Sequence, residues 1–373
     1  MREKKSLFKK DSGTVFMNES VLYPEYVPDA LFHREKEINS LAYAFKPLME
    51  GKKPLNVFLC GGTGIGKTAS VKYVLRELEG ETSRAKHLYL NCFEYSTRAG
   101  ILFKLANFLG AFAPRRGMSI DELYGLILEQ LKKTDFTPLI VLDEADQIIN
   151  SKEESKILYD LLRVTEYQEK KIGLILISNN CELTLKLDPR TKSSLTEESI
   201  QFDKYSPMQL KDILWERAEK AFLPNSCLKE IIDVAAGHAA KLNGDARIAI
   251  ESLLKAGRNA DRANSPVIQL LHLKDAFIEV DSASITKSIK YLDEIEKKVL
   301  NAVASKSELS SGEAYEIYNN SEKEKLTERH LRTIISKLES KKLISAEMIS
   351  MGNKGKTKKI KLNFSKELIE KIK

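Results

Sequence analysis

Residues 61–68 read Gly-Gly-Thr-Gly-Ile-Gly-Lys-Thr, and this stretch decides the fold of the chain. It fits the pattern GxxxxGKT of a phosphate-binding loop, with an apolar run at residues 56–60 before it and a helical pattern at residues 67–78 after it. Glycines let the backbone curl so that its N–H groups face phosphates at the positive end of a helix. The stretch therefore predicts a nucleoside-triphosphate site on an α/β fold, rather than a chance glycine-rich turn.

The loop assigns roles to individual residues. Lys67 would reach the β- and γ-phosphates, and the Thr68 hydroxyl would take one position on Mg²⁺. The other phosphate-binding positions are Gly61, Gly62, Thr63, Gly64, Ile65 and Gly66. We therefore expect ATP or ADP, together with Mg²⁺, as the ligands of this site.

A second motif indicates hydrolysis as well as binding. Residues 139–142 form an apolar run that ends in Asp143 and Glu144. In this arrangement the Asp holds Mg²⁺, and the adjacent Glu, here Glu144, orients the attacking water. Residues 143–146 also spell the name of an RNA helicase family, but no Ser-Ala-Thr motif and no second helicase-type domain follows. We treat that match as a coincidence.

Composition limits the remaining function classes. The chain has 373 residues and 42% hydrophobic content, which predicts two or three domains. No run approaches about 18 uninterrupted apolar residues, so no membrane partner is expected. The four cysteines are far apart and form no CxxC pair, which is typical of reduced core residues in an intracellular protein. They are Cys60, Cys92, Cys181 and Cys227.

The net charge of +7 is concentrated near the C-terminus. Residues 287–373 hold 20 Lys and Arg but 13 Asp and Glu, so they carry the whole excess and the rest of the chain is neutral. Such asymmetry favours contact between this region and a polyanion, most simply nucleic acid. Lysine-rich surfaces also aid solubility, and charge alone leaves that alternative open.

The chain divides into three regions by pattern. Strand-like runs alternate with helical patterns in residues 55–205, which predicts a three-layer parallel α/β domain. The domain is expected to span residues 1–205, with an N-terminal entry segment and a helical insertion at residues 96–133. Residues 206–284 are helical in pattern and predict a small helical domain. The polar stretch 281–284 is expected to link it to a third unit, residues 285–373.

The third unit has the pattern of a winged helix. A helix capped by Thr327 precedes two strand-like runs, residues 343–349 and 357–363, with a basic turn between them. In this fold the third helix enters the DNA major groove and the wing meets the backbone. The predicted contacts are Arg329, Arg332, Thr333, Ser336 and Lys337 on the helix and Lys354, Lys356, Lys358, Lys359 and Lys361 on the wing. The fold also serves as a protein-interaction module, and the lysine cluster favours DNA.

The order of these motifs resembles the archaeal replication initiators related to the Orc and Cdc subunits of eukaryotes. The resemblance rests on the motifs above and on short stretches at residues 18–22, 26–28, 33–35, 177–180, 187–194 and 244–247. It implies an AAA+ nucleotide-binding domain, a helical lid and a C-terminal winged helix. It also implies that Tyr26, Val27 and Arg34 belong to an N-terminal segment near the adenine.

The resemblance assigns three further polar residues. Asn179 matches sensor 1, which hydrogen-bonds the γ-phosphate or the attacking water, although an Asn at a strand end is alternatively a cap. Arg247 matches sensor 2, an arginine whose planar fork suits phosphate oxygens, with a surface ion pair as the alternative. Arg190 resembles an arginine finger aimed at a neighbouring subunit's nucleotide, or else it anchors its own loop.

The insertion resembles a DNA-contacting insertion of the same family, with Arg115 and Arg116 as phosphate contacts. Without the resemblance, two solvated arginines would be favoured.

The family likeness implies a protein of the archaeal cytoplasm and nucleoid that binds double-stranded origin DNA, with slow ATP hydrolysis as a switch. Its expected protein partners are the replicative helicase and paralogous initiator subunits. Two alternatives stay open: a clamp-loader-like ATPase that acts on a protein partner, and a nucleotide-gated transcription regulator.

Overall fold

The computed structural model describes residues 15–114, 117–151, 153–167, 172–195, 197–322, 325–341, 343–350, 356–364 and 369. The chain divides into two units, residues 1–269 and residues 270–373. None of the helices that the structure describes has both the length and the apolar character needed to cross a lipid bilayer.

The first unit is built on a five-stranded sheet of order β2-β3-β4-β1-β5, in which every neighbouring pair runs parallel. The strands β1 and β4 are buried along their whole length, because a parallel sheet covered by helices on both faces needs apolar side chains on both. The strands are β1 (Val57–Cys60), β2 (Ala85–Asn91), β3 (Thr137–Asp143), β4 (Gly173–Ser178) and β5 (Glu198–Gln201).

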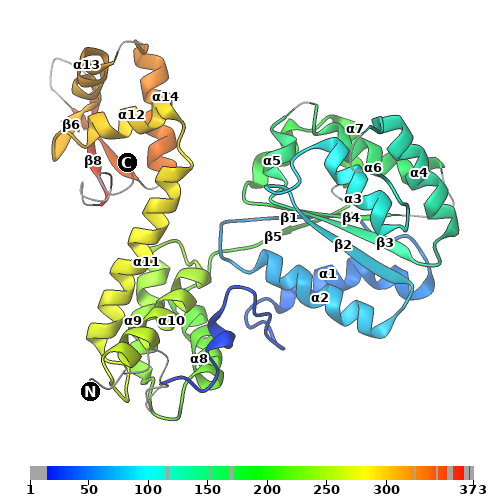
Figure 1. Cartoon of the computed structure of the whole chain (residues 1–373), viewed down its shortest axis with the longest axis horizontal. Helices are drawn as coiled ribbons and strands as arrows, with labels where there is room; N and C mark the ends of the chain where they lie inside the picture. The colour runs from blue at the N-terminus through cyan, green and yellow to red at the C-terminus, as the bar shows by residue number, and fades with distance from the viewer. Residues whose placement is uncertain are drawn as a thin grey trace, which may run out of the picture. The chain divides into compact units, whose positions relative to one another are not determined.

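Helices cover both faces of this sheet (Figure 1). On one face, α1 (Glu35–Phe45) and α2 (Lys67–Glu81) share a core with Leu59 of β1. On the other face, the core contains Phe58 and side chains of α3, α4 and α6. The layers confirm the three-layer parallel α/β prediction. The second-face helices and the short elements are α3 (Arg98–Phe108), α4 (Ile120–Lys133), α6 (Lys156–Tyr167), η2 (Lys46–Glu50), α5 (Asp146–Ile149), η3 (Cys181–Lys186) and α7 (Pro189–Leu195).

The strand order gathers the motif-bearing ends of three strands. β4 lies between β1 and β3 in the sheet. The carboxyl ends of parallel strands lie at the same edge, where ligands of open α/β sheets bind. The phosphate loop after β1, the Asp143-Glu144 pair at the end of β3, and Asn179 after β4 therefore meet at this edge.

One expectation about the cysteines is wrong. Cys60 and Cys181 form a disulfide, with 5.0 Å between their Cα atoms, although 121 residues separate them in sequence. Cys60 ends β1 and is paired in register with Ser178 of β4, so the chain just beyond β4 returns to it. Cys92 and Cys227 remain free thiols, and burial raises the pKa of each to about 12.

The lid consists of three helices, α8 (Pro207–Ala221), α9 (Lys229–Lys241) and α10 (Ala246–Arg262). The N-terminal segment packs on it through η1 (Glu19–Leu22) and through a Phe16 ring stacked 5.1 Å from Phe222. The amide of Val15 also donates to the Asp261 carboxylate at 2.7 Å. The sequence pattern grouped this segment with residues 1–205, whereas its described part covers the lid.

The helical insertion forms α3 and α4. Thr97 caps α3, and Ser119 with Glu122 forms a capping box at the start of α4. Phe112, in the loop between the two helices, is fully exposed. Arg115 and Arg116, the predicted phosphate contacts, lie outside the described residues.

The polar stretch 281–284 is not the expected linker. It lies inside α11 (Leu270–Lys290), a helix that continues without interruption. The stretch contains no Gly or Pro, and Ile278, Ile285 and Ile289 keep helical spacing across it. Local polarity therefore does not end the helix.

The second unit closes with a winged helix, as predicted. Its elements are α12 (Glu294–Val303), β6 (Glu308–Ser310), α13 (Ser311–Ser321), α14 (Glu328–Ser340), β7 (Ile344–Ser350) and β8 (Lys356–Leu362). The three strands form an antiparallel sheet of order β6-β8-β7. Thr327 caps α14, and its buried face carries Leu331, Ile335 and Leu338 into the core. The short strand β6 was not predicted, because three residues carry no periodic signal.

Candidate functional site

The phosphate loop needs glycine where the protein presses against it. Gly61 has φ 146°, and a side chain there would lie 2.5 Å from the Phe202 carbonyl oxygen. Gly66, at the start of α2, has φ 96°, and a side chain there would lie 2.7 Å from the Tyr205 hydroxyl. Positive φ is strained for any residue except glycine. The conformation of the loop therefore requires glycine at positions 61 and 66.

Lys67 is already held at the centre of the loop. Its ammonium donates to the carbonyl oxygens of Gly61 at 2.7 Å and Gly62 at 2.6 Å, and to Asn179 Oδ1 at 3.0 Å. Burial lowers the pKa of Lys67 to about 8, and the carboxylates of Glu144 and Asp143 oppose that shift. Phosphate oxygens of a bound nucleotide would take the place of the two carbonyl oxygens and the Asn179 oxygen around the Lys67 ammonium.

Thr68 and Asp143 form a pair suited to a hard cation. The Thr68 hydroxyl donates to Asp143 Oδ2 at 2.7 Å, and the other carboxylate oxygen accepts the Glu144 N–H at 2.9 Å. Among the described residues no cluster of three or more His, Cys, Asp or Glu could hold a metal. Mg²⁺ in nucleotide sites commonly uses one or two protein oxygens plus phosphate oxygens. The pair therefore fits Mg²⁺ bound with a nucleotide.

Glu144 is placed and tuned as a candidate base. Its backbone φ is 57°, and its carboxylate accepts a hydrogen bond from Asn179 Nδ2 at 2.5 Å. Burial raises the pKa of Glu144, the carboxylates of Asp143 and Asp146 raise it further, and Lys67 lowers it. A raised carboxyl pKa suits a residue that takes a proton from water near neutral pH. Asn179 thus bridges the lysine and the candidate base.

Arg247 approaches the same place from the lid. It lies in the first turn of α10, where the Asp245 side chain accepts the Arg247 N–H at 2.9 Å. Its positive charge acts on both Lys67 and Glu144. The neighbouring Ala246 N–H donates to the Gly64 carbonyl oxygen at 3.0 Å, so the lid touches the phosphate loop directly.

Of the three N-terminal candidates, Arg34 contacts the phosphate loop and Tyr26 contacts the lid. Arg34 is 3% exposed and donates to the carbonyl oxygens of Ile65 at 2.9 Å and Asp203 at 2.7 Å. Its guanidinium also stacks 3.9 Å from the Tyr205 ring centroid. Tyr26 and Val27 are half-buried, and Cζ of Arg217 on α8 lies 4.4 Å from the centroid of the Tyr26 ring.

Arg190 and Thr63 are exposed. Arg190 lies in the first turn of α7, where the Asp188 carboxylate accepts its backbone N–H at 3.1 Å. That arrangement is compatible with a side chain aimed at another subunit and with an anchored loop.

Two groups of the site carry no recognisable motif. The Tyr89 hydroxyl on β2 donates to Asp143 Oδ2. The disulfide joins Cys60, directly before the phosphate loop, to Cys181, two residues after Asn179. No sequence signal would have found Tyr89. The cysteine pairing needs knowledge that β1 and β4 are neighbours.

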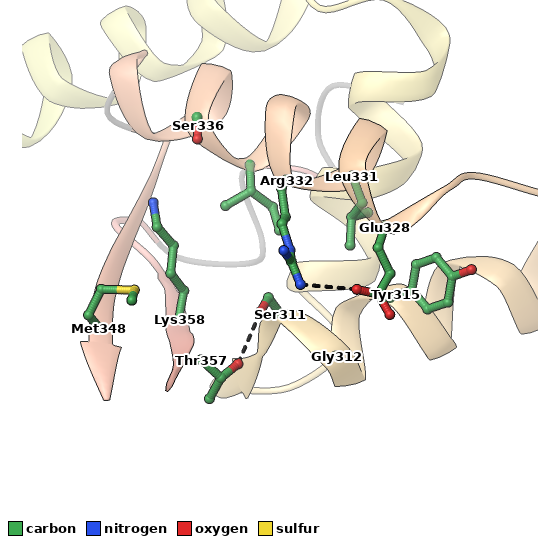
Figure 2. A pocket seen from close by; sticks show the side chains of 11 residues that line it. Ser311, Gly312, Tyr315, Glu328, Leu331, Arg332, Ser336, Met348, Thr357 and Lys358 are labelled. Atoms are coloured by element: carbon green, nitrogen blue, oxygen red, sulfur yellow. Dashed lines mark hydrogen bonds and ion pairs between the residues drawn. The ribbon is translucent and has the colours of Figure 1, made fainter. Parts of the chain in front are cut away.

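The winged helix holds a groove of about 440 Å³ between α13, α14 and the β7-β8 hairpin (Figure 2). Arg332, Ser336 and Lys358 line it together with apolar residues such as Met348. On α14, Arg329, Thr333 and Ser336 are exposed, as the predicted DNA face requires.

Several predicted DNA contacts are paired with acidic neighbours. Arg332 lies 3.0 Å from Glu328, Lys358 lies 3.0 Å from Glu339, and Lys359 lies 2.5 Å from Glu308. Lys337 pairs with the buried Glu296 of α12, which gives it a role inside the domain. Lys354 lies outside the described residues, and only the backbone of Lys356 is described.

Three segments match known domain families. Residues 51–187 match an AAA domain, residues 211–277 a Cdc6 AAA+ ATPase-type lid domain, and residues 287–372 a CDC6 C-terminal winged helix domain. An AAA+ core of this type implies nucleotide binding.

Full-length relatives agree with these matches. An ORC1-type DNA replication protein 1 of Sulfurisphaera tokodaii is 35% identical over 368 residues, covering 96% of this chain and 92% of the relative. One of Archaeoglobus fulgidus is 33% identical over 374 residues, covering 96% and 91%. The solved structure of the Aeropyrum pernix ORC1 protein in complex with DNA has a TM-score of 0.82 and 32% identity, covering 97% of each chain.

Proposed function

This chain belongs to the family of ORC1-type DNA replication proteins, and from that premise we propose that it binds replication-origin DNA with ATP as a switch. The observation that carries the proposal is the likeness, along 97% of the chain, to an ORC1 protein solved in complex with DNA. The protein would act at the nucleoid of an archaeal cell and help to recruit or load the replicative helicase.

The nucleotide end would bind ATP through residues that already face one another. Lys67 would exchange the loop carbonyl oxygens for β- and γ-phosphate oxygens. Thr68 and Asp143 would hold Mg²⁺, which neutralises charge on the phosphates when it is bound. Glu144 would orient the attacking water and take its proton, with Asn179 fixing the carboxylate.

Contact between the lid and the phosphate loop supports a switch role. Gly64 accepts the Ala246 N–H, and the charge of Arg247 acts on Glu144 across the same boundary. A triphosphate in the loop would give Arg247 a new anionic partner, which would favour one lid position over another. Slow hydrolysis would remove that partner and release the lid.

DNA binding is assigned to the winged helix and the insertion. Arg329, Thr333 and Ser336 on α14 would read base edges, while the wing lysines would contact phosphates. Arg115 and Arg116 would add phosphate contacts from the first unit.

The experiment is a salt series of DNA affinity for the full chain and for a fragment of residues 270–373, which keeps α11 whole. Each phosphate contact releases counterions, so replacing Lys358 and Lys359 by Gln should flatten the salt dependence by about one unit of slope per lost contact. Sequence preference should survive. If the fragment matched the full chain in affinity, slope and preference, the insertion would contribute nothing and the two-part assignment would be wrong.

A further inference from the structure

Three donors converge on the carboxylate of Asp143. The Tyr89 and Thr68 hydroxyls both donate to Oδ2, the second at 2.7 Å, and the Glu144 N–H donates to Oδ1 at 2.9 Å. The Tyr89 bond comes from a strand that carries no nucleotide motif. Its presence means that Asp143 is oriented from two sides of the sheet edge rather than by the phosphate-loop helix alone.

The fold explains how Tyr89 reaches this carboxylate. Among the described strands, β2 pairs with β3 alone, in a register that sets Asn91 opposite Asp143 and Tyr89 opposite Val141. Side chains two residues apart on a strand share a face. Tyr89 therefore lies on the same face of the sheet as Asp143, two residues earlier along the paired strands. The tyrosine side chain is long enough for its hydroxyl to reach the Asp143 carboxylate.

The environment keeps the Tyr89 hydroxyl a donor. The residue is half-buried, and the ammonium of Lys72, one turn beyond Thr68 on α2, lies 4.9 Å from its ring centroid. A tyrosine phenol keeps its proton throughout the physiological pH range, so the Tyr89 hydroxyl can donate to the Asp143 carboxylate.

We propose that Tyr89 is a positioning residue for the magnesium-nucleotide complex, fixing the Asp143 carboxylate so that Asp143 and Thr68 together face the cation. This inference rests on the proposed nucleotide function. The backbone of the phosphate loop and Lys67 contact phosphates without help from Asp143. Tyr89 should therefore govern how strongly Mg²⁺ tightens nucleotide binding and leave metal-free binding unchanged.

The test measures ADP affinity of the full chain by calorimetry, once with Mg²⁺ and once with EDTA. Tyr89→Phe removes one hydroxyl and nothing else. We expect it to reduce the Mg²⁺-dependent gain in affinity by about three- to tenfold, the range for one lost hydrogen bond of ordinary strength. Affinity in EDTA should equal that of the wild type.

Two further variants calibrate the result. Thr68→Val removes a proposed Mg²⁺ ligand and should abolish the gain. Tyr73→Phe removes a hydroxyl from α2 that does not bond Asp143, and it should behave as wild type. The inference is overturned if Tyr89→Phe keeps the full gain while Thr68→Val loses it, or if Tyr89→Phe weakens binding equally with and without metal. A wild-type chain that gained nothing from Mg²⁺ would overturn the proposed nucleotide site as well.

Discussion

The nucleotide end and the groove of the winged helix use charged side chains in opposite ways. At the nucleotide end, Lys67 and Asp143 are 6% and 5% exposed, and each is hydrogen-bonded within the site. In the groove, Arg332 and Lys358 lie at the surface and pair with acidic neighbours on their own domain. The charged groups of the first site are therefore buried and hydrogen-bonded within it, whereas those of the second form ion pairs within their own domain.

This difference predicts different responses to damage. Removing one member of a buried polar network leaves its partners desolvated and unpaired, which is costly. Exposed ion pairs are screened by salt and contribute little, so DNA phosphates replace the acidic partners readily. The nucleotide end should therefore fail abruptly when one residue changes, and the DNA face should weaken in steps.

The largest expected effect is on stability, through the disulfide that fixes the nucleotide end; the winged helix contains no cysteine. Cys60 and Cys181 close a loop of 121 residues. Chain-entropy reasoning gives such a cross-link about 5 kcal/mol. Cys181→Ser should lower the free energy of unfolding of the first unit by up to this amount, measured by denaturant unfolding.

Cys227→Ser is the matched control and should leave that free energy nearly unchanged. Reduction of the wild type should reproduce the effect of Cys181→Ser, and reduction of Cys181→Ser should add nothing. Equal stability of oxidised and reduced wild type would contradict the assigned role of the disulfide.

The next effect separates two steps at the nucleotide end. Lys67→Ala should weaken ATP binding by roughly a hundredfold, since hydrogen bonds to a charged group contribute about 1.5–3 kcal/mol each. Glu144→Gln should keep binding and lower turnover by about 10²–10⁴-fold, the range for a lost general base. Calorimetry measures the binding step, and phosphate release measures the hydrolysis step. Undiminished hydrolysis by Glu144→Gln would show that Glu144 is not the base.

The sequence reveals the nucleotide end better than its surroundings. The loop, the Asp143-Glu144 pair and Asn179 each follow an apolar strand, and the parallel order brings these strand ends together. The family and the fold were therefore predictable and are confirmed. The Cys60–Cys181 pairing and the Tyr89 contact depend on which strands are neighbours, and no local pattern encodes that.

At the DNA face, sequence predicts charge but not its partners. Lys337 belongs to the exposed basic pattern of α14, yet it turns to the buried Glu296. Arg34 similarly lies under the phosphate loop, because its fork matches backbone carbonyl oxygens. Such pairings depend on distances across the tertiary fold, which the linear pattern does not contain.

A smaller effect is expected on DNA discrimination. Thr333→Ala or Ser336→Ala should reduce the preference for origin over random DNA by about 1–3 kcal/mol per lost base contact. Lys337→Gln is the control, because its partner is Glu296, and it should alter stability more than preference. Competition binding with both DNAs measures this. If the preference for origin DNA were unchanged in both α14 variants, other residues would have to recognise the bases.

The smallest predicted signal concerns Arg190. If its guanidinium completes a neighbour's site, mixing Arg190→Ala with Lys67→Ala subunits forms some intact composite sites. Hydrolysis should then rise to about a quarter of the wild-type rate at equal mixing, assuming that paired subunits associate at random. No rise under conditions where the subunits demonstrably associate would leave Arg190 as an anchor of its own loop.

An origin-binding initiator should be found in the cell at the positions where replication begins. Crosslinking the protein to DNA in its own cells and sequencing the bound fragments would map its sites, and marker frequency would map replication start points in the same cultures. The bound sites should concentrate at the start points if this chain is an initiator. Sites spread over promoters, with no enrichment at the start points, would contradict it and favour a nucleotide-gated transcription regulator.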